Sequence, residues 1–161
     1  AVHDIVVHPK TGDLIVGTHG RSIYLGNIIP LQRMAEAKPL MVFEIENARI
    51  PRDLGTKKNI WSSKEKESLP IRIYTENQGK VMLKIENDKG IVYSDYINVK
   101  KGINIYDFNY SIGPAGIQYL KSAEDKNFEA ADDGKYYLPS GSYTLKVEQA
   151  DAKDETKLEL K

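Results

Sequence analysis

Short segments in which apolar and polar residues alternate, separated by glycine-containing turns, constrain this chain more than any other feature. Val81, Leu83 and Ile85 share one parity, and the segment Ile71–Thr75 alternates in the same way. A period of two places successive side chains on opposite faces of a strand. Turn signals recur about every ten residues, which favours an antiparallel sandwich over a parallel sheet with crossover helices. The sequence therefore predicts an all-β fold.

The main domain is expected over residues 40–161, as a β-sandwich that begins with an extended strand at Leu40–Ile45. Alternating arms predict one hairpin that turns at Asp88–Gly90, and a last hairpin that joins 142–148 to 156–160. The polar range 47–66 and the glycine-rich range 111–135 interrupt this pattern. We expect both to be long loops, the second with one or two helical turns at Ile117–Ala123.

Residues 1–29 form a different kind of segment. Apolar stretches at 4–8, 13–18 and 22–25, with turns between them, predict a meander of three short strands. Three short strands are too few to bury both of their faces. We therefore expect this segment to need partners, with a bare apolar patch at Ile5, Val7, Ile15 and Ile23 as its sign. Residues 30–39 are expected to be a short helical linker.

The bulk composition excludes several classes of function. Lys and Arg together number 23, as do Asp and Glu, so the balance of charge predicts no nucleic-acid partner. No run approaches the roughly 18 apolar residues that a membrane span requires. The chain has no cysteine, which removes thiolate metal sites, disulfides and a cysteine nucleophile. It opens at Ala1 without a leader, so we expect a mature or excised piece whose targeting signal lies upstream.

Two groups of motifs resemble one known kind of protein. The stretch Val2–Pro9 followed by Asp13–Tyr24, which contains Thr-His-Gly-Arg, resembles the end of the propeller in large secreted bacterial proteins with sortilin-like (BNR/YVTN-type) repeats. The stretch Val81–Asp107, together with Pro139–Val147, is similar to their C-terminal immunoglobulin-like domain of the flagellar-hook-cap type. Its Pro-x-Gly-x-Tyr pattern falls at Pro139, Gly141 and Tyr143. One departure is that Gly26-Asn27 replaces the acidic pair usual after the tyrosine.

The resemblance implies a function for the whole chain. Residues 1–29 would be the closing strands of the last propeller blade, and residues 40–161 an immunoglobulin-like accessory domain. Proteins of this group are often described as glycosyl hydrolases, and the resemblance implies an extracytoplasmic location. We expect the fragment itself to be non-catalytic, with no cofactor, and the rest of the parent propeller as its partner.

All three histidines, His3, His8 and His19, lie in the propeller-like part. We expect no metal site from them, because His3 and His8 are five residues apart and would point to opposite faces of an unbroken strand. The motif Thr18-His19-Gly20-Arg21 has two interpretations. Arg21 could bind an anionic ligand in the propeller channel, or the motif could fix blade closure by hydrogen bonds. We favour the structural interpretation.

A carbohydrate-binding or surface-anchoring module is the alternative function. Trp61, Tyr136 and Tyr137 are its principal candidate stacking residues, and other tyrosines would extend the platform, namely Tyr74, Tyr93 and Tyr96. Catalytic carboxylates are not expected. Asp132 and Asp133 lie beside Gly134 in a polar turn, where aspartates commonly bond to the backbone.

Overall fold

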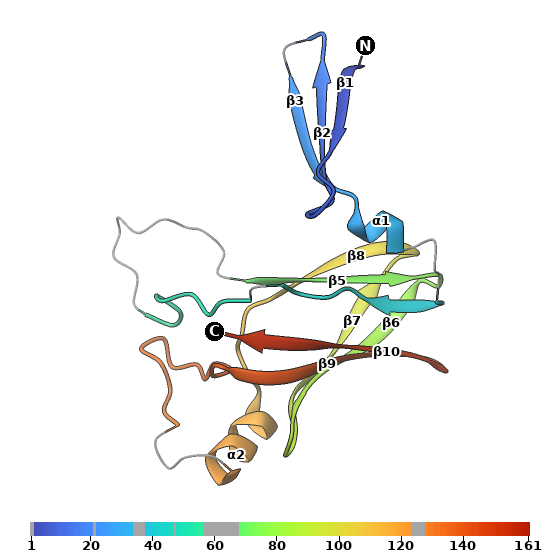
Figure 1. The fold of residues 1–161 in the computed structure, drawn as a ribbon. Helices are drawn as coiled ribbons and strands as arrows, with labels where there is room; N and C mark the ends of the chain where they lie inside the picture. The colour runs from blue at the N-terminus through green and yellow to red at the C-terminus, as the bar shows by residue number, and fades with distance from the viewer. Residues whose placement is uncertain (1, 21, 34–37, 47, 57–67, 124–127) are drawn as a thin grey trace. The chain divides into compact units, whose positions relative to one another are not determined.

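The computed structural model describes the chain apart from residues 1, 21, 34–37, 47, 57–67 and 124–127 (Figure 1). The chain divides into two compact units, Ala1–Lys38 (unit 1) and Pro39–Lys161 (unit 2). Every sheet in the described residues is antiparallel. The predicted all-β class is therefore confirmed.

Unit 1 holds three strands in the order β1-β2-β3, which are Val2–Val7, Asp13–Thr18 and Ile23–Asn27. The meander expected from the sequence is present. The first hairpin closes at Gly12, whose φ of 64° is unfavourable for residues with a side chain. A short helix, α1 (Ile29–Arg33), follows. The end of the expected helical linker, at 34–37, lies outside the described residues.

Unit 2 arranges its strands in two sheets, as Figure 1 shows. The three-stranded sheet has the order β4-β5-β8, with bounds Leu40–Val42, Leu69–Thr75 and Gly102–Phe108. The four-stranded sheet has the order β10-β9-β6-β7, with bounds Ala152–Leu160, Gly141–Gln149, Gly79–Asn87 and Gly90–Val99. Both predicted hairpins, β6–β7 and β9–β10, are present.

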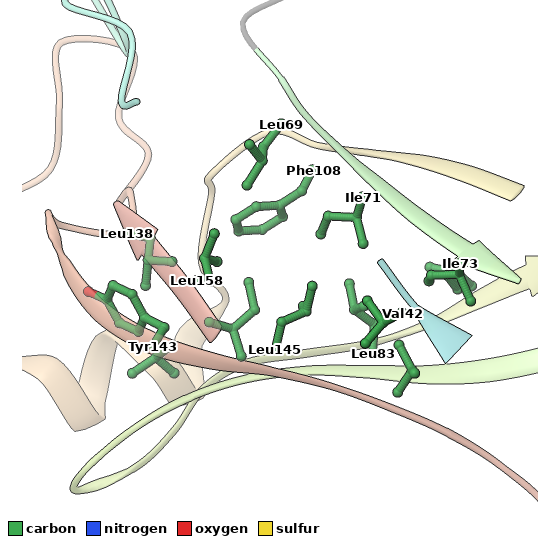
Figure 2. Packing of buried hydrophobic residues seen from close by; sticks show 14 of the residues in the cluster. Val42, Leu69, Ile71, Ile73, Leu83, Phe108, Leu138, Tyr143, Leu145 and Leu158 are labelled. Atoms are coloured by element: carbon green, nitrogen blue, oxygen red, sulfur yellow. The ribbon is translucent and has the colours of Figure 1, made fainter. Parts of the chain in front are cut away.

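The core lies between these two sheets (Figure 2). On β6 the residues Val81, Leu83 and Ile85 are fully buried, as their shared parity predicted. Ile71 and Ile73 on β5 are equally buried in the other sheet. Complete burial of a side chain of this size contributes roughly 1.5–3 kcal/mol. The alternating pattern therefore supplies unit 2 with a core of its own.

The predicted lead-in strand at Leu40–Ile45 is too long, because β4 ends at Val42. The Phe43 N–H still donates to the Arg72 carbonyl on β5 (3.0 Å), and beyond it the chain bonds to the end of β10. The Val42 N–H donates to Asp154 Oδ2 on β10 (2.9 Å). Farther on, the Ile50 N–H donates to the Lys161 carbonyl (2.9 Å), and the Lys161 N–H donates to the Ala48 carbonyl (3.1 Å). Val42, Ala48 and Ile50 thus bond to β10 and its end, and cover an edge that would otherwise be exposed.

The range 111–135 also differs from the expected loop. It contains α2 (Pro114–Ala123), a helix of ten residues that begins earlier than the sequence suggested. Proline suits the first turn of a helix, because its missing N–H has no partner there. The helix packs on β7, where Val92 is the extra residue of a β-bulge. Gly116 approaches so closely that a Cβ there would lie 2.0 Å from the Val92 carbonyl oxygen.

Gly116→Ala is expected to destabilise unit 2 by about 1–3 kcal/mol, since the new methyl would collide with backbone. The sign of this stability change is informative, because replacing a helical Gly with Ala otherwise stabilises a helix by roughly 1 kcal/mol. Urea unfolding measures the change. Gln118→Ala, at an exposed position of the same helix, should stay within about 0.5 kcal/mol. A Gly116→Ala protein more stable than the original would show that α2 does not need the close contact between Gly116 and Val92.

Candidate functional site

The Thr18–Arg21 motif lies at the turn between β2 and β3. The Thr18 N–H and Oγ1 both donate to the Ser22 carbonyl, at 3.0 and 3.1 Å, which closes the turn. His19 Nδ1 lies 2.5 Å from His3 Nε2 at the start of β1. Gly20 is exposed in the turn, and Arg21 lies outside the described residues. The described part of the motif therefore joins strands of its own sheet.

The remaining histidine, His8, belongs to a separate polar cluster in the β1–β2 turn. Its Nδ1 accepts from the Thr11 N–H (3.2 Å). Asp13 accepts from the Thr11 hydroxyl (2.7 Å) and from Asn27 Nδ2 (3.1 Å), and these two hydrogen bonds lower its pKa. Among the described residues, no group of three or more His, Cys, Asp or Glu side chains could hold a metal ion.

Tyr136 and Tyr137 contact different neighbours. The Tyr136 ring lies against Phe128 at 5.4 Å between centroids, and Lys121 Nζ sits 4.7 Å from the same ring while donating to its hydroxyl. Tyr137 packs beside Gly55. Both tyrosines are half-buried. Phe128 and Lys121 contact the Tyr136 ring, which a stacked sugar would need to reach.

The other tyrosines of the proposed platform are dispersed. Tyr74 is buried, and Tyr93 packs on Phe108 in the core, whereas Tyr96 is 60% exposed on β7. The Tyr93 hydroxyl lies 2.8 Å from that of Tyr106, and burial together with this contact raises the Tyr93 pKa. Trp61 lies outside the described residues. Of the described tyrosines in the proposed platform, Tyr96 alone is largely exposed.

Asp133 is one of two carboxylates in the polar turn at 130–134, beside Asp132. It accepts from the Tyr137 hydroxyl (2.6 Å) and from the Lys135 N–H (3.0 Å). These hydrogen bonds, the Tyr137 bond foremost, lower its pKa. Its own N–H donates to the Gly55 carbonyl (3.0 Å), so the turn is tied to residues 48–56.

The Pro139–Tyr143 motif forms a compact corner at the start of β9. The Tyr143 hydroxyl donates to the Pro139 carbonyl (2.9 Å), four residues upstream, while its ring is buried. A Cβ at Gly141 would lie 3.5 Å from that ring. Figure 2 shows Tyr143 beside Leu138 at one end of the core. These contacts hold Pro139, Gly141 and Tyr143 together at the entry to β9.

The sheet of unit 1 carries apolar residues on both of its faces, a feature that the sequence analysis understated. The row Val6, Ile15 and Leu25 crosses one face of the sheet in register. The adjacent row of Ile5, Val16 and Tyr24 crosses the other face. The sequence signal for two apolar faces was the continuous apolar run in each strand. Alternation is typical of a sheet with one solvent-exposed face, whereas continuous apolar runs are typical of strands buried on both faces.

Tyr143→Phe is expected to destabilise unit 2 by about 0.5–1.5 kcal/mol, because the Pro139 carbonyl would lose a part-buried hydrogen bond. Chemical denaturation measures this. Tyr96→Phe removes a hydroxyl from an exposed ring and should change stability by less than about 0.5 kcal/mol. Equal effects of the two variants would argue against a role for the corner.

Tyr137→Phe is expected to raise the Asp133 pKa toward its ordinary value, since the strongest hydrogen bond to the carboxylate disappears. The folded-state pKa lies below the unfolded one, so this bond stabilises the fold at neutral pH. That contribution is lost as pH falls through the lowered pKa. NMR titration of the carboxyl carbon measures the change. Tyr136→Phe serves as the control, and an unchanged Asp133 in Tyr137→Phe would contradict the assignment.

Comparison with known proteins places no further constraint on these sites. No protein-family model, curated protein or solved structure matches the chain. Neither described helix combines the length and apolarity needed to cross a membrane.

Proposed function

We propose that this chain is a non-catalytic, C-terminal accessory or interaction region of a larger β-propeller protein. In this proposal unit 1 supplies closing strands to a blade, and unit 2 is an immunoglobulin-like module. The parent protein would be extracytoplasmic and of the sortilin-like repeat type that the motifs resemble. The sequence motifs suggest this assignment, and the apolar faces of unit 1 support it most strongly.

Unit 1 exposes apolar side chains on both faces of one sheet. On one face, Ile15, Ile23 and Leu25 are 44%, 78% and 73% exposed. On the other, Ile5 and Tyr24 are 58% and 62% exposed. A sheet at the surface of a protein has one polar face, whereas a propeller blade lies between two neighbours. The two apolar faces therefore favour an interior layer of a larger assembly over an independent sheet.

The arrangement of unit 2 supports the immunoglobulin-like part of the proposal. Its strands divide three and four between two antiparallel sheets. In immunoglobulin-like domains a tyrosine near the start of the sixth strand bonds back to the backbone a few residues upstream. Tyr143 stands near the start of β9, the sixth of the strands β4–β10, and bonds to Pro139 in this way.

Three carboxylates of the described residues act as hydrogen-bond acceptors within the fold. The pKa values of Asp13, Asp133 and Glu148 are lowered, and each has a hydrogen bond as its first cause: Thr11 for Asp13, Tyr137 for Asp133 and Lys84 for Glu148. These groups stay ionised and serve as acceptors that hold turns and strands together.

A hydrophobic dye tests the proposal. Unit 2 has its own core, so residues 39–161 should fold alone and bind little 8-anilinonaphthalene-1-sulfonate. The 161-residue chain should give about fivefold or more fluorescence, because unit 1 exposes both apolar faces. The double variant Ile23→Ser/Leu25→Ser should reduce this fluorescence. In the complete parent polypeptide the excess fluorescence should be absent.

Two results would contradict the proposal. One is equal dye fluorescence from residues 39–161 and 1–161. The other is a parent reading frame that encodes no propeller repeats.

A further inference from the structure

We propose that His3 and His19 together form a binding site for a divalent transition-metal ion, with water completing the coordination of the ion. Imidazole nitrogens are ligands that suit Zn²⁺ and its neighbours in the first transition series. The inference is independent of the proposed function, because it depends on the geometry of two side chains within unit 1. It comes from the contact that joins the start of β1 to the turn after β2.

The two imidazole rings direct one nitrogen each toward the other ring. His3 Nε2 lies 2.5 Å from His19 Nδ1. The ring centroids are 4.7 Å apart, and the ring planes differ by 26°. Both side chains are exposed, so an ion in solution can reach them. The pair therefore offers two converging nitrogen ligands at the surface of the sheet.

A β-bulge accounts for the position of His3. The register of β1 against β2 shifts between Val2 and Asp4, which leaves His3 as the extra residue. A bulge changes the direction of a side chain, and bulges are common beside functional sites. The expectation of no metal site assumed an unbroken strand, whereas this strand is bulged and His3 meets a histidine of the neighbouring turn.

The turn that carries His19 is closed by hydrogen bonds of its own. The Thr18 N–H and Oγ1 both donate to the Ser22 carbonyl. A ligand that is held in place loses less conformational entropy when it binds an ion. His8 has a different environment, because its Nδ1 accepts from the Thr11 N–H (3.2 Å). His8 is therefore a matched control for the pair.

A metal ion can take the place of the proton that lies between the two nitrogens. In the neutral pair one nitrogen donates this proton and the other accepts it. A metal ion needs the lone pairs of both nitrogens, so the proton moves to the far nitrogen of its own ring and no net proton is released. Two nitrogens bound to one ion lie roughly 3 Å apart, because each bond is about 2.0–2.1 Å long. Small rotations of two exposed side chains widen the 2.5 Å separation to this value.

Titration of the 161-residue chain with ZnCl₂ tests the inference. The NMR signals of the carbon-bound ring protons of His3 and His19 should shift with the same midpoint, because both rings bind the same ion. By calorimetry, His3→Gln and His19→Gln should each weaken binding by about tenfold or more, since two linked ligands bind far more tightly than one. His8→Gln should change the affinity by less than about twofold.

A second control separates the pair from the amino terminus. A chain extended by Gly-Ser ahead of Ala1 moves the terminal amine away from His3, and it should bind Zn²⁺ as tightly as the original chain. Loss of binding in the extended chain would overturn the inference, because the amine would then be the second ligand. A shift of only one of the two histidines, or equal weakening by His8→Gln, would also overturn it.

Discussion

The burial of apolar sheet faces is the interaction on which this structure depends. A pleated sheet sends side chains to two faces, and each apolar face must meet another surface. Unit 2 meets this need by facing one sheet with another, with Ile71 and Ile73 in one and Leu83 and Leu145 in the other. Unit 1 has a single sheet with apolar residues on both faces. One chain therefore contains a sandwich with its own core and a sheet whose apolar faces are exposed.

Hydrogen bonds at the margins define how the sandwich closes. Tyr143 fixes the entry into β9, and Asp154 ties β10 to β4. Tyr93 and Tyr106 meet hydroxyl to hydroxyl and connect β7 with β8, which belong to different sheets. Each bond contributes about 1 kcal/mol, far less than the core, yet each selects one arrangement of the sheets. The core supplies most of the stability, and these contacts supply the uniqueness.

Local pattern predicted the strands of unit 2 because polar residues alternate with buried ones, most clearly on β6. On β6, Lys84 and Glu86 alternate with the buried residues and pair with Glu148 and Lys146 across the sheet. Contacts between distant segments could not be predicted in this way. The bond that ties Val42 to Asp154 joins residues more than a hundred positions apart. The start of α2 has a local signal in Pro114, but the packing of this helix depends on the close approach of Gly116 to Val92 on β7, which no local pattern records.

The aromatic residues show the same limit in the candidate site. Composition offered several tyrosines as one stacking platform, but strand parity and tertiary contacts separate them. Tyr74 and Tyr93 are drawn into packing, Tyr136 is bracketed by Phe128 and Lys121, and Tyr96 remains alone on an outer face. The continuous apolar runs in β1, β2 and β3 were a better guide to a candidate binding surface than the number of tyrosines. Such a run indicates how many faces of a strand are apolar. That count directs attention to unit 1, whose two apolar faces we propose to be covered by a partner.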